Sequence, residues 1–122
     1  MEWLKISTSN ALVRVKTDDI VYVAAAGNYS DLVLADGQRH TLVFQLHYFE
    51  EAFRQLRRNH FVRVGRSIIV NRHFVFNLNL SDKSLLLAGF PLAKEMRLNA
   101  SREALKELKT ALEAEKGENG HE

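Results

Sequence analysis

Short apolar-rich runs separated by turn-forming residues dominate the chain. Runs of this kind, bounded by Gly, Asn, Asp and Ser, are typical of β-strands. The segment 20–24 (Ile-Val-Tyr-Val-Ala) is apolar at every position, which indicates a strand buried on both faces. Asp36-Gly37 favours a tight hairpin turn. The pattern predicts about nine to ten short strands, near residues 3–7, 11–16, 20–24, 29–34, 39–43, 61–64, 67–70, 74–80, 84–87 and 90–98.

The spacing of apolar residues changes after residue 45. Leu46, Phe49, Phe53 and Leu56 recur at steps of three and four residues, and charged residues fill the positions between them. This period predicts a short amphipathic helix whose apolar stripe packs on the sheet.

A second helix is predicted near the C-terminus. Ser101 is placed to cap it, and Leu105, Leu108 and Leu112 form its apolar stripe. From residue 114 the sequence is polar, so we expect one domain over residues 1–113 and a frayed tail over 114–122. The expected fold is mainly β, with one short internal helix and one C-terminal helix.

Composition excludes several classes of protein. The chain has no cysteine, which excludes a disulfide framework, a thiolate nucleophile and a cysteine zinc site. No apolar run reaches the roughly 18 residues of a membrane span, and no signal peptide opens the chain. We therefore expect a cytoplasmic protein that does not enter membranes.

Catalytic chemistry has little support. The five histidines are scattered and form no ligand set with carboxylates. Ser67 has no Gly-x-Ser-x-Gly environment, and residues 25–28 lack the second glycine and the lysine of a phosphate-binding loop. The sequence predicts no enzyme, no metal site and no cofactor.

Positive charge is concentrated in one segment, although the net charge of the chain is only +2. Residues 52–81 contain six arginines and no lysine, and all fifteen acidic residues lie outside this segment. Arginine offers a planar fork of donors that suits phosphate oxygens and the edge of guanine. Two interpretations remain open: a surface that faces a polyanion, or arginines that pair with Asp and Glu brought in by folding.

The segment 61–73 (Phe-Val-Arg-Val-Gly-Arg-Ser-Ile-Ile-Val-Asn-Arg-His) carries the most specific pattern. Two β-rich runs flank Gly65-Arg66, so Arg66 is expected to project from a tight connection. Arginine pairs bidentately with guanine and asparagine with adenine, so Arg66 and Asn71 are candidates for base recognition. Arg63 shares strand parity with Phe61, and it is either a structural ion-pair partner or a contact residue.

Four blocks of sequence resemble the LytTR-type (LytR/AlgR-family) DNA-binding domain of bacterial transcription regulators. They are residues 19–29, the helix 46–56, residues 61–71 with Phe-x-Arg-Val-x-Arg-Ser and Val-Asn, and residues 99–102. The resemblance covers roughly residues 3–112. It implies an elongated stack of antiparallel sheets with a short helix between them. It also implies that loops at one end enter successive major grooves, usually on imperfect direct repeats in promoters.

The resemblance also implies which residues contact bases. They are Asn28 and Tyr29 in the 27–29 turn, Arg66 with Ser67, and Arg102 beside Ser101. Each has an ordinary alternative: Asn28 as a turn residue, Tyr29 as a packed strand residue, and Ser101 as a helix cap. Asn71 matches the family pattern either as a contact or as a residue that fixes the loop.

Two positions depart from the family pattern. Gly65 stands where the family commonly has histidine, and Ala25 or Ala26 where it has glutamate. The glycine removes one polar contact and makes the loop more flexible. Family members usually follow a receiver domain, which would place the receiver or a sensor kinase pathway outside this chain; the chain is either a freestanding regulator or an excised output domain.

The leading hypothesis is sequence-specific binding of double-stranded DNA in transcription regulation. A homodimer on direct repeats is compatible with this hypothesis. The candidate phosphate contacts are Arg57, Arg58, Arg72, Lys94, Ser101 and Lys106. The alternative is a protein-interaction or dimerisation module of the same fold, with little DNA binding, which Gly65 and the missing receiver favour.

Overall fold

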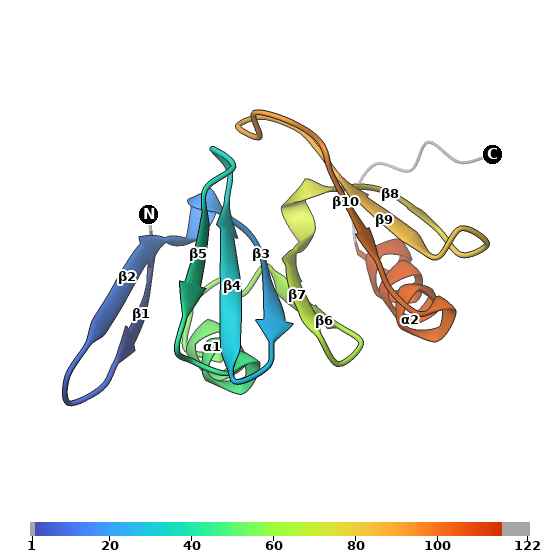
Figure 1. Cartoon of the computed structure of the whole chain (residues 1–122). Helices are drawn as coiled ribbons and strands as arrows, with labels where there is room; N and C mark the ends of the chain where they lie inside the picture. The colour runs from blue at the N-terminus through green and yellow to red at the C-terminus, as the bar shows by residue number, and fades with distance from the viewer. Residues whose placement is uncertain (1, 116–122) are drawn as a thin grey trace.

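This computed structural model describes residues 2–115, which form ten strands and two helices (Figure 1). The strands are β1 (Trp3–Ser7), β2 (Leu12–Lys16), β3 (Ile20–Ala26), β4 (Tyr29–Leu34), β5 (Arg39–Leu42), β6 (Phe61–Val64), β7 (Ile68–Asn71), β8 (Val75–Asn79), β9 (Ser84–Leu87) and β10 (Met96–Asn99). The helices are α1 (Leu46–Arg54) and α2 (Arg102–Glu113), with 3-10 turns η1 (Thr17–Asp19) and η2 (Arg72–Phe74). The expected mainly β fold with one internal and one C-terminal helix is confirmed. From residue 116 the expected tail lies outside the described residues.

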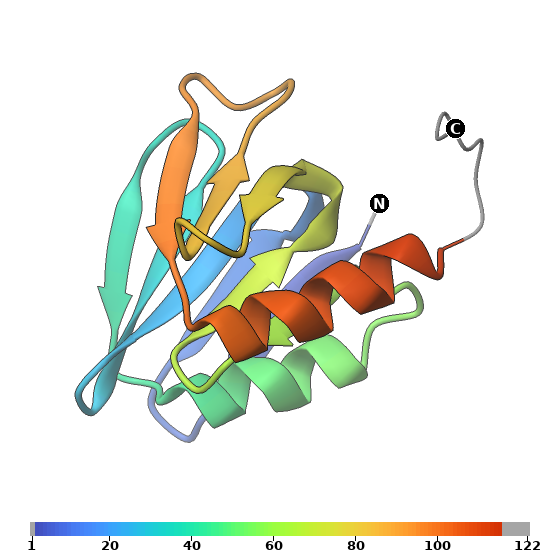
Figure 2. The same ribbon diagram turned by 90° about the vertical axis from the view of Figure 1, so that its right-hand side faces the viewer.

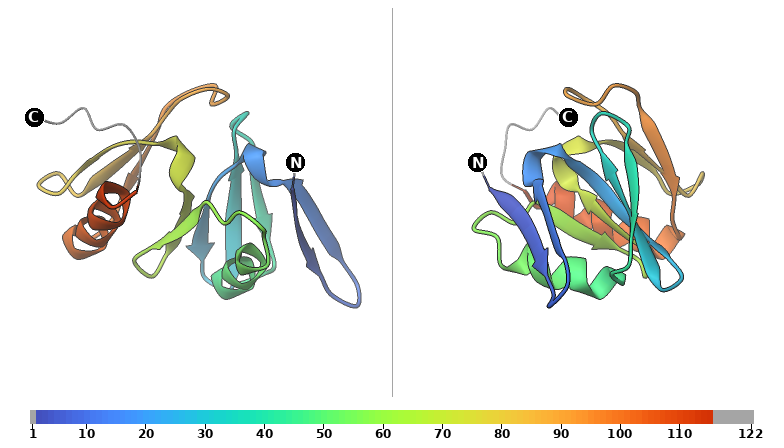
Figure 3. Two further views of the ribbon diagram at one scale, coloured as in Figure 1. Left: turned by 180° about the vertical axis from the view of Figure 1, so that it is seen from behind. Right: turned by 60° about the vertical axis from the view of Figure 1, so that its left-hand side comes forward.

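The described strands form three antiparallel sheets that follow one another along the molecule (Figures 1 and 3). They are the hairpin β1-β2, a central five-stranded sheet in the order β5-β4-β3-β7-β6, and a three-stranded sheet in the order β10-β9-β8. This arrangement confirms the expected stack of sheets.

Strand β3 lies in the middle of the central sheet and is buried on both faces. Ile20 and Val23 face one apolar cluster, whereas Val21 and Tyr22 face the other. In a regular strand the side chains of Val21 and Tyr22 would point to opposite faces of the sheet. An irregularity in the pairing with β4, between Ile20 and Tyr22, brings both to the same face. The continuous apolar run in the sequence is thus explained by two cores that share one strand.

The first core joins α1 and β1 to the central sheet. Leu46, Phe49 and Phe53 form the buried stripe of α1. Phe53 stacks on Phe61 of β6, with ring centroids 3.9 Å apart and planes 7° apart. The stripe predicted from the sequence therefore packs on the sheet as expected.

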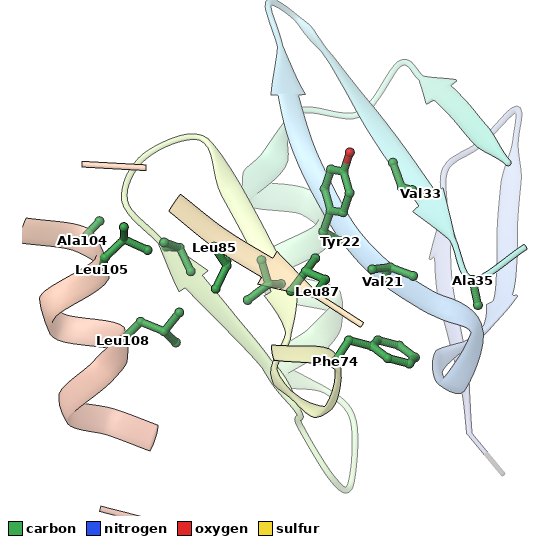
Figure 4. Packing of buried hydrophobic residues seen from close by; sticks show 12 residues of the cluster. Val21, Tyr22, Val33, Ala35, Phe74, Leu85, Leu87, Ala104, Leu105 and Leu108 are labelled. Atoms are coloured by element: carbon green, nitrogen blue, oxygen red, sulfur yellow. The ribbon is translucent and has the colours of Figure 1, made fainter. Parts of the chain in front are cut away.

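The second core joins α2 and the β8–β10 sheet to the opposite face (Figure 4). Leu105 and Leu108 of α2 point towards Leu85 and Leu87 of β9, and all four side chains are buried. A helix of 12 residues is only marginally stable by itself in water, so α2 depends on this packing for its stability.

The last predicted strand was wrong in its first half. We expected a strand over residues 90–98, but β10 begins only at Met96. Phe90 is 98% exposed, so its side chain contributes nothing to a sheet face. The main chain before β10 bonds as a loop instead: Leu92 N–H donates to Gly89 O, and Ala93 N–H to Ala35 O. Apolar composition alone did not distinguish this loop from a strand.

We expect Leu105→Ala to lower the free energy of unfolding by about 2–5 kcal/mol, because it opens a cavity between α2 and the sheet. Urea denaturation measures the effect. Leu12→Ala on β2, where the side chain is 59% exposed, is the control and should cost less than about 1 kcal/mol. Equal losses in the two variants would contradict the second core.

Candidate nucleic-acid interface

Antiparallel pairing brings two turns to the same end of the central sheet. The C-terminal end of β3 lies beside the N-terminal end of β7, where Ala25 N–H donates to Ser67 O at 2.8 Å. The β3–β4 turn at residues 27–28 and the β6–β7 turn at residues 65–67 therefore lie at one end, at the lower left in Figure 2.

The start of α2 completes this end of the molecule. Residues 64–68 and 99–101, with Glu103, Ala104 and Glu107, line a depression of about 500 Å³ between the β6–β7 turn and α2. Gly65 packs closely there, since a Cβ on it would lie 3.4 Å from Cβ of Ala104. Ser101 Oγ accepts the N–H of Ala104 at 3.1 Å, which confirms Ser101 as the helix cap. We call this end, formed by residues 27–29, 65–67 and 101–102, the loop end.

The expected base-contact residues all lie at the loop end, and their side chains are available. Asn28, Arg66, Ser67 and Arg102 are exposed, and Tyr29 is 49% exposed. Within residues 2–115 no carboxylate lies within ion-pair distance of Arg66 or Arg102. The loop end therefore offers two guanidinium groups without carboxylate partners in this range and, at the same end, an exposed amide.

Two further residues at this end were missed by sequence reasoning. Gln45, which precedes α1, donates from Nε2 to Asn28 Oδ1 at 3.3 Å and steadies that side chain. Lys83, in the β8–β9 turn, accepts the N–H of Ala100 at its carbonyl, at 3.2 Å. Neither residue stands in a motif, and both come close to the site only through tertiary packing.

Three of the six arginines of segment 52–81 pair with carboxylates, as the second interpretation anticipated. Arg63 Nη1 lies 2.8 Å from Glu50 Oε1, and Arg54 Nη1 lies 2.7 Å from Glu51 Oε2. Arg72 Nε lies 2.9 Å from Glu115 Oε2, so this candidate phosphate contact has a carboxylate partner already. The first interpretation, a surface of these arginines that faces a polyanion, therefore does not hold for Arg54, Arg63 and Arg72.

Other candidate phosphate contacts lie away from the loop end. Arg57 and Arg58 line a hollow with Glu2 and residues 17–18, beside the start of β3. Their main-chain N–H groups donate to the Glu2 carboxylate at 2.9 and 3.2 Å. These hydrogen bonds, led by that of Arg57, lower the pKa of Glu2.

Lys94 and Lys106 lie on different parts of the molecule. Lys94 follows Ala93, whose N–H donates a hydrogen bond to Ala35 O near the β4–β5 turn. This turn lies at the top in Figure 1. Lys106 is exposed on α2, one turn beyond the loop end. Of the two lysines, only Lys106 is close enough to extend the same surface.

Asn71 has a structural position. Its side chain is buried, donates from Nδ2 to Ile20 O at 3.0 Å and accepts the N–H of His73 at 3.1 Å. It thus fixes the connection from β7 to η2, which supports the second of its two expected roles. No contact with DNA is open to a side chain that is 4% exposed.

A pair of histidines lies beside Arg57 and Arg58. The rings of His60 and His73 have centroids 3.8 Å apart. Burial lowers the pKa of His60, and the positive charges of His73, Arg72 and Arg58 add to this effect, while Asp18 opposes it. Protonation of His60 is therefore disfavoured in the folded protein.

Within residues 2–115, no three His, Cys, Asp or Glu side chains are grouped so that they could hold a metal ion. No helix in the same part of the chain is long and apolar enough to cross a membrane.

The fold and the loop end define a class of mainly β domains that gather polar and basic turns at one end of stacked antiparallel sheets. The sequence matches the family model of the LytTr DNA-binding domain over residues 10–113. This match covers most of the chain, which therefore belongs to the LytTR family of DNA-binding domains.

One solved structure similar to the chain is the LytTr DNA-binding domain of a putative methyl-accepting/DNA response regulator from Bacillus cereus. The TM-score is 0.64 at 18% sequence identity, over 92% of this chain and 97% of that one. At this identity the likeness concerns the fold. No curated protein sequence matches the chain significantly.

We expect His60→Gln to flatten the dependence of stability on pH between about 7.5 and 5.5. In the wild type the pKa of His60 is below its ordinary 6.5, so the unfolded chain binds a proton before the folded chain does. The contribution of His60 to stability is therefore fully present above pH 6.5 and is lost as the pH falls towards the pKa of the folded state. Urea denaturation at the two pH values measures the difference.

The control for this prediction is His47→Gln, which removes an exposed histidine from α1. It should leave the pH dependence as in the wild type. A wild-type protein that gains stability on acidification over this range would contradict the assignment.

Proposed function

We propose that this domain binds double-stranded DNA with sequence specificity and acts in the regulation of transcription. One observation carries the proposal: Arg66 is exposed and without a carboxylate partner in residues 2–115, and its turn lies at the same end of the molecule as the turn of Asn28 and the start of α2 with Arg102. Membership of the LytTR family supports the same conclusion.

The chemistry of the loop end suits base edges and phosphates. A guanidinium group binds guanine O6 and N7 through two hydrogen bonds, and an asparagine amide binds adenine N6 and N7. Arg66 and Arg102 would take the first role and Asn28 the second, with Tyr29 and Ser67 as adjacent contacts. At the start of α2, the Ser101 O–H can donate to a phosphate while Oγ still caps the helix.

The proposed interface has three separate turns, so it enters the grooves as loops instead of inserting a helix. We propose that these loops enter successive major grooves and that two copies occupy imperfect direct repeats in promoters. We also propose a cytoplasmic output role, with a receiver domain or a sensor kinase pathway outside this chain. The family match over residues 10–113 supports the DNA-binding part of that role. Selection of duplexes from a randomised pool tests the repeat arrangement.

We expect Arg66→Ala to weaken binding to a selected site by about 1–3 kcal/mol and to relax the preference at one or two base pairs. Fluorescence anisotropy on matched and single-substitution duplexes measures both effects. Arg58→Ala is the control, since it removes the same charge away from the loop end. It should weaken binding less, and equally on all sequences. If Arg66→Ala leaves affinity and preference intact, Arg66 does not read bases.

We expect Lys106→Ala to weaken binding to all duplexes alike and to reduce the slope of log affinity against log salt by about one. A lysine that neutralises a phosphate releases a counterion when the complex forms, which is the origin of the slope. Lys94→Ala is the matched control, and it should leave the slope unchanged. Affinity titrations between about 50 and 200 mM salt measure the slope.

The same titration separates DNA binding from a protein-interaction module of the same fold. Phe76 and Phe90 are 72% and 98% exposed, which is the kind of apolar surface that a protein partner covers. If the wild type binds no duplex with a steep salt dependence, while Phe90→Ser disrupts a protein complex, the alternative replaces the proposal.

A further inference from the structure

The guanidinium group of Arg63 connects helix α1 to the β6–β7 turn. Nη1 donates to Glu50 Oε1 at 2.8 Å, and Nη2 donates to the main-chain carbonyl oxygen of Arg66 at 2.7 Å. The Arg63 and Glu50 side chains are each about one-third exposed, so water screens the pair only in part. One planar fork thus forms hydrogen bonds to a carboxylate on a helix and to the backbone of an exposed turn.

This turn needs external support. It consists of residues 65–67 between the closing pair Val64 and Ile68. Gly65 has φ +66°, a left-handed conformation that glycine adopts freely and that no side chain stiffens. A neighbouring backbone group holds the turn at one residue, where Ser67 O accepts the N–H of Ala25. Arg63 holds it at the preceding residue, through the carbonyl of Arg66.

We propose that Arg63, held by Glu50, is a positioning residue that sets the sequence discrimination of the Arg66 turn without touching DNA itself. This inference rests on the proposed function of the loop end. Both terminal nitrogens of Arg63 already have acceptors, whereas the Arg66 side chain has none among the described carboxylates. Fixing the backbone at Arg66 orders the guanidinium group before DNA arrives, which reduces the entropy lost on binding.

The sign of a charge effect distinguishes this role from simple electrostatics. Removing Glu50 takes a negative charge away from a DNA-binding domain, and electrostatics alone predicts tighter binding to every duplex. Electrostatics alone leaves the ratio of specific to non-specific affinity unchanged, whereas loss of the support changes this ratio. That ratio falls, because a loosened Arg66 turn gains less from the correct base pair.

The first experiment compares Glu50→Met with Glu51→Met in the full chain. Both carboxylates are on α1 and both lie near Arg54, so the variants change the charge equally, but only Glu50 contacts Arg63. We expect Glu50→Met to lower the specificity ratio roughly three- to tenfold, the range expected for one unordered long side chain. Glu51→Met should leave the ratio unchanged. Equal ratios in the two variants would overturn the proposal.

Arg63→Lys provides a second variant that keeps the charge. A lysine cannot hold two acceptors with a planar fork, so we expect the same loss of specificity with an unchanged salt slope. The double variant Glu50→Met/Arg63→Lys should lose no more than either single variant, since both break one connection. Additive losses would contradict the connection. Circular dichroism and urea denaturation confirm that each variant is folded.

The second experiment needs no DNA. Backbone ¹⁵N relaxation of the free protein should show residues 65–67 as ordered as β6 in the wild type and in Glu51→Met, and less ordered in Glu50→Met and Arg63→Lys. An equally rigid turn in all four proteins would overturn the positioning role. If the wild type itself binds all duplexes alike, the proposed function fails, whereas the relaxation data still decide whether Arg63 holds the turn.

Discussion

The antiparallel pairing of β3 with β7 is the constraint on which the rest of the structure depends. Among the described strands, every other pair joins neighbours in the chain, whereas this pair joins segments that are more than 40 residues apart. It places β3 between two cores, so that α1 and α2 cover opposite faces of one sheet. It also brings the turns after β3 and before β7 to one end, which creates the loop end.

Charge is divided between structure and recognition. Arg54, Arg63 and Arg72 have carboxylate partners, whereas Arg66 and Arg102 at the loop end have none in the described chain. A pair that is one-third exposed contributes little to stability by itself, so the ion pair of Arg63 matters more for where it holds the turn than for its energy. Of the six arginines of segment 52–81, three are thus held by carboxylates, whereas Arg66 is left without one at the loop end in the described part of the chain.

Much of the fold was predictable from residue patterns. The strand limits of β1, β4, β6 and β9 follow from runs bounded by turn residues, and the α1 stripe follows from its period. Residues 90–95 were assigned to a strand wrongly, because apolar composition does not reveal whether a side chain is covered. Phe90 is an aromatic residue of the kind that strands favour, yet its side chain is exposed.

The sequence by itself determined the elements, the single turn that carries Arg66, and the resemblance that identified the family. These depend on local backbone preferences and on motifs of neighbouring residues. Only the tertiary structure decided which arginines are neutralised and which candidates share a surface. Glu50 and Glu115 reach Arg63 and Arg72 across 13 and 43 positions, and Asn71 turns inward to Ile20. Such contacts follow from strand pairing and helix packing over long separations, which no local pattern encodes.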